Sequence, residues 1–315
     1  IAASASVLCA SKSAISCIVS FSLSLSPIIS FSSSLDQAGV FGRDVEDTAL
    51  LALQTMGYDP KDSTSSDTQL PDLSSSMKKD LKGMKIGIPK EYYCDGLDKE
   101  TEKLWADSVE ILKKEGAKIK EISLPHTKYG IAAYYVIAPA EASSNLARFD
   151  GVHFGYRSSQ AHDLESTYKL SRTEGFGEEV KRRIMLGTFV LSSGYYDAYY
   201  VKAQKLRTLI SQDFRNAFEQ VDALITPTAP STAFAIGERM DDPVQMFIND
   251  VFTVPASMAG VPAISVPGGL ADDGLPLGLQ LITKAYDEET LFRVADVLEN
   301  SVGFDAKPSY LGGMS

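Results

Sequence analysis

The chain has 315 residues, of which 44% are hydrophobic and 23% charged, and its mean hydropathy is −0.05. These values are ordinary for a globular protein and exclude a multi-span membrane protein, and the length suffices for one large domain or two small ones. The formal net charge of −11 argues against direct binding of a nucleic-acid backbone as the main activity.

The sulfur and imidazole groups show no metal-binding pattern. An odd number of cysteines without a CxxC pair gives no disulfide framework and suits a reducing compartment. The histidines lack the spacing of metal ligands, so we expect no metal site. These residues are Cys9, Cys17, Cys94, His126, His153 and His162.

The composition changes sharply near residue 28. Residues 1–27 are mainly Ser, Ala and small aliphatic residues, with a single charge at Lys12. The segment Ala14–Phe31 is apolar, but one lysine makes a poor signal-peptide start and a transit peptide would contain arginine. We therefore expect residues 1–27 to be a fragment end or a reading-frame error, with a targeting peptide as the alternative, and residues 28–315 to be part of a folded domain.

The first elements after this break predict a βαβ unit. Asp44 is a suitable N-cap for a helix that Gly57 would stop. Further on, Lys85–Pro89 and Lys118–Ile122 are expected as short strands on either side of an amphipathic helix over Asp98–Gly116. Strand, helix and strand in this order indicate parallel strand pairing.

The second half of the chain adds helices and strands in a mixed order. We predict an α/β fold with a mixed, largely parallel sheet and helices on both faces, which places sites at strand ends and on the following loops. The expected helices are Tyr129–Phe149, Glu178–Phe218 and Asp287–Asn300, and the expected strands are Asp222–Thr226, Ala263–Val266 and Leu277–Ile282.

Two charged motifs suggest a free amino acid as ligand. Lys181-Arg182-Arg183 opens a helix, where basic residues oppose the macrodipole; it is either a solvated face or contains an arginine that grips a carboxylate. Asp250 precedes an apolar run and could be a cap or a ligand for an ammonium group. Sequence spacing alone does not show that these side chains converge.

Four tyrosines stand within six residues at Tyr195-Tyr196-Asp197-Ala198-Tyr199-Tyr200. On a helix they would cover most of the circumference. We therefore predict that this helix is enclosed in the core, with a partner for each hydroxyl group.

A series of ordered strings resembles a known family. From residue 28 to about residue 304 the chain is similar to the A subunits of aspartyl/glutamyl-tRNA amidotransferases, within the amidase signature family. The strings include Phe31 to Gln37, Gly87 to Tyr92, Glu141 to Leu146, Val180 to Gly187, Gly194 to Tyr200, Lys202 to Gln204, Thr226 to Pro230, Asn249 to Val251 and Leu277 to Leu281.

This resemblance implies an activity and its chemistry. Such subunits hydrolyse glutamine to glutamate and ammonia, using a Ser–cis-Ser–Lys triad and a glycine-rich oxyanion loop that precede the Phe31 string. Residues 1–27 contain no glycine, so we assign no catalytic residue and expect no glutaminase activity from the chain as it stands. The serines Ser32, Ser33 and Ser34 match a family segment outside the triad.

The resemblance also implies partners. A B subunit would use ATP and Mg to activate the glutamate on Glu-tRNA(Gln) and amidate it, would hold most of the tRNA, and would be clasped to this chain by a C subunit. No cofactor is expected in this chain, nor any membrane contact. The expected location is a bacterial cytoplasm, with a mitochondrion or plastid as the alternative.

The resemblance transfers three glutamine-binding residues by motif. Arg183 would pair with the substrate carboxylate, Asp250 with its amino group, and Tyr134 would line the pocket; Arg182 is the alternative if the register shifts by one. Two other functions stay open: a non-catalytic interaction subunit that binds the B and C subunits, and a fragment of another amidase-signature hydrolase.

Overall fold

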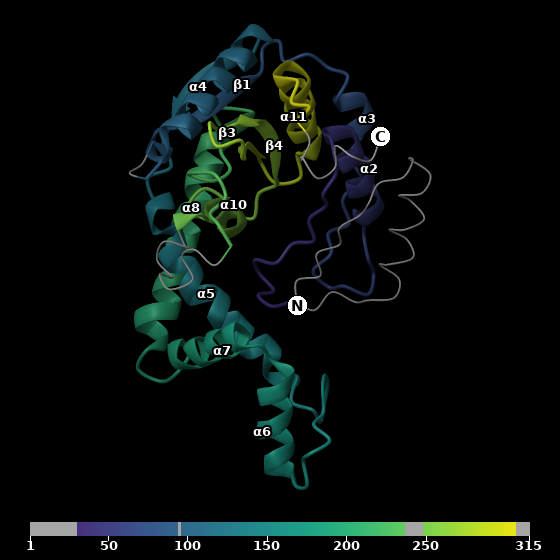
Figure 1. The fold of residues 1–315 in the computed structure, drawn as a ribbon, viewed down its shortest axis with the longest axis vertical. Helices are drawn as coiled ribbons and strands as arrows, with labels where there is room; N and C mark the ends of the chain where they lie inside the picture. The colour runs from purple at the N-terminus through teal and green to yellow at the C-terminus, as the bar shows by residue number, and fades with distance from the viewer. Residues whose placement is uncertain (1–29, 94–95, 237–247, 307–315) are drawn as a thin grey trace.

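The computed structural model describes residues 30–93, 96–236 and 248–306 (Figure 1). The expectations for residues 1–27, including Lys12, Cys9 and Cys17, and for Cys94 lie outside the described residues. No helix in the described part is both long and apolar enough to cross a bilayer.

A five-stranded sheet lies at the centre of the fold, in the order β2-β1-β3-β5-β4. The pairs β1–β2 and β1–β3 are parallel, whereas β3–β5 and β4–β5 are antiparallel. The predicted mixed sheet is confirmed, but the expectation that it is largely parallel is wrong, because β4 and β5 form a hairpin and β5 also pairs antiparallel with β3. The strands are β1 (Lys85–Pro89), β2 (Lys118–Ile122), β3 (Ala223–Pro227), β4 (Ala263–Leu270) and β5 (Pro276–Thr283).

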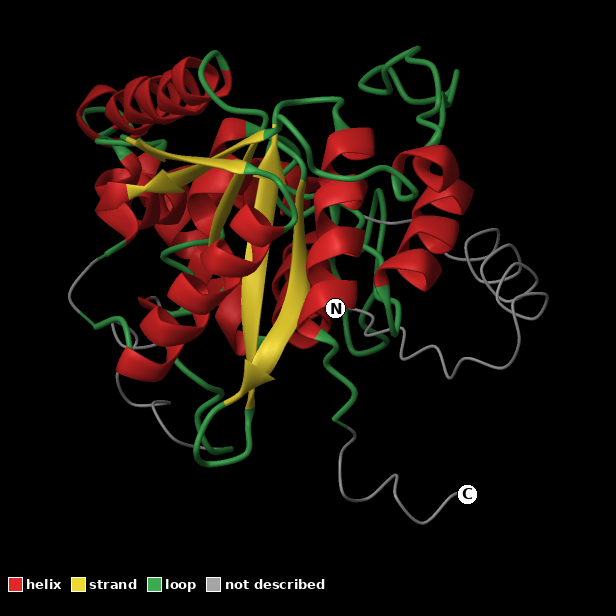
Figure 2. Cartoon of the chain, turned by 90° about the horizontal axis from the view of Figure 1, so that it is seen from above, coloured by secondary structure: helices red, strands yellow, loops and turns green. Residues whose placement is uncertain are grey.

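Helices cover both faces of the sheet, as predicted (Figure 2). Neighbouring residues of a strand point to opposite faces, and β5 shows what each face meets. On one face, Leu279 packs against Gly268 of β4 together with Leu104 of α4 (Lys99–Lys114). On the opposite face, Gln280 donates a hydrogen bond to the carbonyl of Phe252, which precedes α10 (Val254–Ala259). All five residues of β3 are buried, because both of its faces are covered.

The layer on the Leu279 face contains α4 (Lys99–Lys114) and α11 (Glu288–Val302), which pack on each other and on the sheet. On the Gln280 side, α10 (Val254–Ala259) packs against α8 (Lys202–Phe218), and α8 against α5 (Gly130–Asn145). The other helices are α2 (Val45–Thr55), α3 (Leu73–Ser76), α6 (Leu164–Gly175) and α7 (Glu178–Val190). Short 3-10 turns are η1 (Lys90–Tyr92), η2 (Thr127–Tyr129) and η3 (Leu146–Arg148).

Local sequence signals account for most of these boundaries. The Asp44 side chain caps α2 by accepting a 2.7 Å hydrogen bond from the Asp47 amide, and Gly57 follows the helix with a φ of +142°. Asp287 caps α11 in the same way by accepting a hydrogen bond from the Thr290 amide. The predicted strands β1 and β2 are confirmed at their predicted residues.

The predicted continuous helix over Glu178–Phe218 is wrong. The helix α7 ends at Val190, Gly194 adopts a φ of +89°, and a π-helical segment η4 (Tyr196–Val201) leads into α8. A run of two serines and a glycine provides little helix propensity and permits the positive φ, so the chain turns there.

The predicted enclosure of the four tyrosines is also wrong. The residues Tyr195, Tyr196 and Tyr199 are 42–46% exposed, and the rings stack on one another along η4 rather than inside the core. Tyr200 is half-buried, and its hydroxyl accepts a hydrogen bond from Gln204. The turn at Gly194 removes these rings from the helix face that packs inward.

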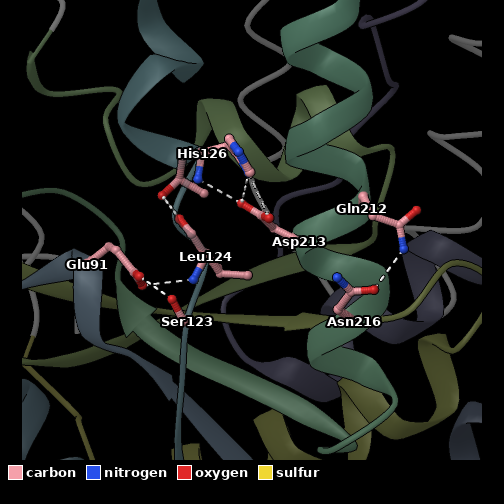
Figure 3. Close-up of polar contacts among 8 residues, drawn as sticks. Glu91, Ser123, Leu124, His126, Gln212, Asp213 and Asn216 are labelled. Carbon is pink, nitrogen blue, oxygen red and sulfur yellow. Dashed lines mark hydrogen bonds and ion pairs between the residues drawn. The ribbon is translucent and has the colours of Figure 1, made fainter.

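Polar contacts fasten the segment between β2 and α5 to its neighbours (Figure 3). The buried carboxylate of Asp213 on α8 accepts a hydrogen bond from the His126 amide and lies 2.9 Å from His126 Nδ1. Glu91 accepts hydrogen bonds from the Ser123 hydroxyl and the Leu124 amide. These contacts fix the start of α5, which carries part of the site described next.

Candidate functional site

Arg183 lies in the second turn of α7, after two glutamates that begin the helix. Its Nε donates a 2.9 Å hydrogen bond to Glu179 Oε1, and its side chain is 26% exposed. Burial lowers the pKa of Arg183, but the bond to Glu179 and the nearby Tyr134 more than reverse this, so the net pKa is raised and the guanidinium stays charged. Acidic residues at the helix start also compensate the basic cluster that follows them.

Arg182, the alternative in register, has a different environment. It is 73% exposed and forms a 3.0 Å ion pair with Glu179. Solvent-facing pairs of this kind contribute little to stability and leave the side chain in water. The structure therefore places Arg183, and not Arg182, next to the other predicted site residues.

Tyr134 and Tyr135 lie on α5 with their rings in edge-to-face contact, 5.1 Å between centroids. Burial raises the pKa of the Tyr135 hydroxyl to about 12, with Arg183 opposing the shift and Asp250 adding to it. The hydroxyl of Tyr135 is thus protonated throughout the physiological range and lies in the field of both charges.

Asp250 precedes α10, two residues before the buried Phe252. The residue is exposed by surface area, yet partial desolvation of its carboxylate raises its pKa, and the positive charge of Arg183 opposes that shift. Asp250 and Arg183 therefore lie within electrostatic range although no hydrogen bond joins them.

Arg183, Asp250 and Tyr134 each keep polar atoms that form no hydrogen bond with the described residues. Within the described part of the chain, no protein atom accepts a hydrogen bond from the Nη groups of Arg183 or donates one to the Asp250 carboxylate. The Tyr134 hydroxyl has no hydrogen bond among the described residues either. None of these atoms is a buried group left without a partner, so each is open to solvent and to a polar ligand.

Close packing of α5 against α7 brings Arg183 close to Tyr134 and Tyr135 (Figure 1). Gly187 of α7 is buried against the backbone of α5, and a Cβ atom there would lie 1.9 Å from the Pro139 carbonyl oxygen. Arg183 is one helical turn before Gly187, and Tyr135 is one turn before Pro139. The glycine thereby sets the distance between the arginine and the tyrosines.

The serine-rich segment after residue 30 has a structural role. The hydroxyls of Ser32 and Ser34 donate hydrogen bonds of 2.7 and 2.5 Å to the Glu141 carboxylate on α5. Arg207 of α8 donates to the Ser34 hydroxyl and carbonyl and to the Met258 carbonyl. These hydroxyls are held by a network of charged groups that joins the segment to α5 and α8.

A hollow lies beside the site. Asn249, next to Asp250, lines an open cavity of about 470 Å³ together with Thr228 and Ser265, whose hydroxyl oxygens are 2.7 Å apart. This cavity is at the end of β3, where the sequence predicted that a site would lie. No group of three His, Cys, Asp or Glu side chains that could hold a metal ion occurs among the residues described.

Sequence reasoning missed two aromatic members of the site. Phe31 and Tyr135 each face the Arg183 guanidinium, with the ring centroids 5.8 and 5.9 Å from its Cζ atom. Tyr135 adjoins Tyr134 in the sequence and Phe31 begins one of the ordered strings, so each was adjacent to a recognised signal. Neither spacing nor composition indicates that a ring so distant in sequence reaches the arginine.

Comparison with known proteins places this arrangement in a family. A sequence profile of the family described as Amidase matches residues 20–292. The chain belongs to the amidase family. The resemblance inferred from the sequence is thus confirmed at the family level.

Individual members of the amidase family are similar over most of the chain. The A subunit of the glutamyl-tRNA(Gln) amidotransferase from Granulibacter bethesdensis is 57% identical over 87% of this chain and 55% of its own length. The same-named protein of Persephonella marina is 60% identical over 83% of this chain and 54% of its own. This amidase-family chain therefore spans about half the length of the curated relatives it matches.

Solved structures agree with the fold. The crystal structure of the glutamyl-tRNA(Gln) amidotransferase A subunit from Thermotoga maritima has a TM-score of 0.69 and 39% identity over 86% of this chain and 54% of that chain. The peptide amidase of Stenotrophomonas maltophilia, at 23% identity and a TM-score of 0.67 over 90% of this chain and 57% of that chain, shows the same fold. The α/β fold class is confirmed.

Proposed function

We propose that this chain is the glutamine-binding part of a glutaminase subunit in a tRNA-dependent amidotransferase. The observation that carries the proposal is an arginine and an aspartate of opposite charge near Tyr134, where the Arg183 Nη groups, the Asp250 carboxylate and the Tyr134 hydroxyl have no hydrogen-bond partner among the described residues. The relatives of the chain are named as A subunits of amidotransferases. Opposite charges within electrostatic range of each other suit an α-amino acid, which carries a carboxylate and an ammonium group on one carbon.

Each residue would have one role. Arg183 would bind the α-carboxylate through its two Nη groups in a bidentate, charge-assisted contact. Asp250 would accept a hydrogen bond from the α-ammonium group. This contact would offset the partial desolvation of its carboxylate. Tyr134 would direct its hydroxyl to the side-chain amide and so favour glutamine over an aliphatic amino acid.

The remaining steps would need other groups. Hydrolysis requires a nucleophile with its base and an oxyanion hole, and we assign none of these to described residues. Ammonia released from glutamine would pass to a B subunit that uses ATP and Mg to amidate glutamyl-tRNA(Gln) and that holds the tRNA, with a C subunit joining the two. The expected location is the cytoplasm.

Isothermal titration of the purified chain with L-glutamine tests the proposal. We expect saturable one-site binding that is lost in Arg183→Ala and Asp250→Ala and kept in Ser33→Ala, an exposed serine without a side-chain hydrogen bond in the described structure. Folding of each variant is checked by circular dichroism. Absence of binding by a folded wild-type chain would refute the proposal.

A second assay separates the proposal from the interaction-subunit alternative. Glutamate release from glutamine is measured with the chain alone and after reconstitution with candidate B and C subunits. Release that depends on Arg183 would support a glutaminase subunit and would overturn the expectation that the chain as it stands has no glutaminase activity. Binding of glutamine and of the partner subunits without any release supports a non-catalytic interaction subunit.

A further inference from the structure

The guanidinium of Arg183 contacts two aromatic rings from different parts of the chain. Phe31 precedes α2, and Tyr135 lies on α5; each ring centroid is within 6 Å of Arg183 Cζ. This is the range in which a ring quadrupole attracts a cation. The third contact of the side chain is the hydrogen bond from Nε to Glu179.

These contacts restrain the guanidinium without using the atoms that a carboxylate needs. The Glu179 bond takes the Nε hydrogen, and ring contacts consume no hydrogen-bond donor, so both Nη groups stay available within the described structure. A free arginine side chain loses rotamer entropy on being fixed. A guanidinium already held by two rings loses less of that entropy when the ligand binds.

Phe31 is itself held firmly. The Asp36 carboxylate accepts a hydrogen bond from the Phe31 amide, and the Asn145 side chain of α5 donates to the Phe31 carbonyl at 3.2 Å. The next residue, Ser32, is buried and donates to Glu141 of α5. The ring is thus anchored to the same helix that carries Tyr135, and its position relative to Arg183 is fixed by backbone contacts on both sides.

We propose that Phe31 is a positioning residue that, with Tyr135, clamps Arg183 in the orientation that receives the ligand carboxylate. The inference rests on the proposed function for the identity of the ligand, but the clamp itself is a property of this chain. It predicts that the identity of residue 31 affects recognition of the carboxylate and not of the rest of the amino acid.

Titration of the full chain with two ligands tests the clamp. L-Glutamine carries the carboxylate, and L-glutaminamide replaces it with a neutral amide. Phe31→Leu keeps an apolar side chain of similar size without a π face, and Phe31→Tyr restores the aromatic ring. We expect Phe31→Leu to raise the Kd for glutamine about two- to fivefold with little change for glutaminamide, and Phe31→Tyr to restore the wild-type value.

Two results would overturn the proposal. An unchanged glutamine Kd in Phe31→Leu would show that the ring does not affect the arginine. An equal loss for both ligands, not restored by tyrosine, would show that Phe31 only supports the fold. Ser33→Ala, in the same turn, controls for local disturbance.

A resonance measurement without ligand tests the clamp independently of the proposed function. If the wild type does not bind glutamine, the proposed function fails but the clamp is still tested. The Nε–H resonance of Arg183, assigned by its loss in Arg183→Lys, should be shifted by the ring currents of Phe31 and Tyr135. In Phe31→Leu it should move towards the position of a solvent-exposed arginine, and in Phe31→Tyr it should stay. A resonance that does not move in Phe31→Leu overturns the clamp.

Discussion

Replacement of Gly187 by alanine should disturb both the fold and the site. The new Cβ would lie 1.9 Å from the Pro139 carbonyl oxygen and 2.9 Å from the Ala140 nitrogen, both backbone atoms that cannot move alone. An ordinary contact needs about 3.4 Å, so α5 and α7 must separate by on the order of 1.5 Å. Overpacking of this kind costs about 1–3 kcal/mol, and the better helix propensity of alanine returns at most about 1 kcal/mol.

The increased distance between α5 and α7 would also move Arg183 away from Tyr135, because each lies one helical turn from the contact between Gly187 and Pro139. We expect Gly187→Ala to lower the free energy of unfolding in urea by about 2 kcal/mol and to weaken glutamine binding on the order of tenfold, as loss of a charge-assisted hydrogen bond does. The control is Gly130→Ala on α5, where a Cβ would meet its nearest atom at an ordinary 3.4 Å. A Gly187→Ala chain as stable as wild type, with unchanged binding, would refute this account of the helix contact.

Four further predictions concern the charge of Asp250, the core and a helix cap. Glutamine affinity should fall as pH decreases through the pKa of Asp250, which is raised above its ordinary value near 3.8, because protonation removes the charge that pairs with the ammonium group. Titrations of the wild type with glutamine across this pH range check the prediction. The control is Asp250→Asn, which should bind glutamine weakly at every pH. At neutral pH the Asp250→Asn variant should unfold at a higher urea concentration than the wild type. A carboxyl whose pKa is raised by desolvation in the folded state stabilises the fold only while it is protonated, and this stability is lost as pH rises through that pKa. The ionised Asp250 therefore destabilises the wild type at neutral pH, and asparagine removes this cost. Leu224→Ala, in the fully buried strand β3, should lower the free energy of unfolding by about 2–5 kcal/mol in a urea melt. Asp44→Ala should cost about 1 kcal/mol in the same melt through loss of the α2 cap, with Glu46→Ala as an exposed neighbour for comparison.

The sequence predicted the sheet well because its signals are local. β1 is a short, largely apolar run, and β2 sets two isoleucines among three charged residues. Asp44 and Asp287 mark helix starts by their own hydrogen bonds. The break after Val190 was missed because the helical pattern on either side outweighed the short run Ser192-Ser193-Gly194, where low helix propensity and the positive φ of Gly194 make the turn. Hydrophobic periodicity alone does not reveal such a turn.

The site was predicted in part. Arg183, Asp250 and Tyr134 came from motif resemblance, and the structure brings the first two within electrostatic range with no mutual hydrogen bond. Helical periodicity could not choose between adjacent arginines, because the choice depends on which helix packs beside α7. The Phe31 contact is a tertiary property and had no signal in the spacing of the chain.

The position of β3 between the two halves of the sheet has a consequence for the order of folding. The hairpin β4–β5 closes a short loop, whereas β3 must pair with β1 across a separation of 137 positions, as the bond between Lys85 and Asp222 records. Loop-closure entropy makes the distant pairing the slower event. Arg183 and Tyr135 both lie inside that long connection and can meet before it closes, whereas Phe31 lies outside it. Loop-closure entropy therefore makes the ring of Phe31 the later of the two to reach the arginine.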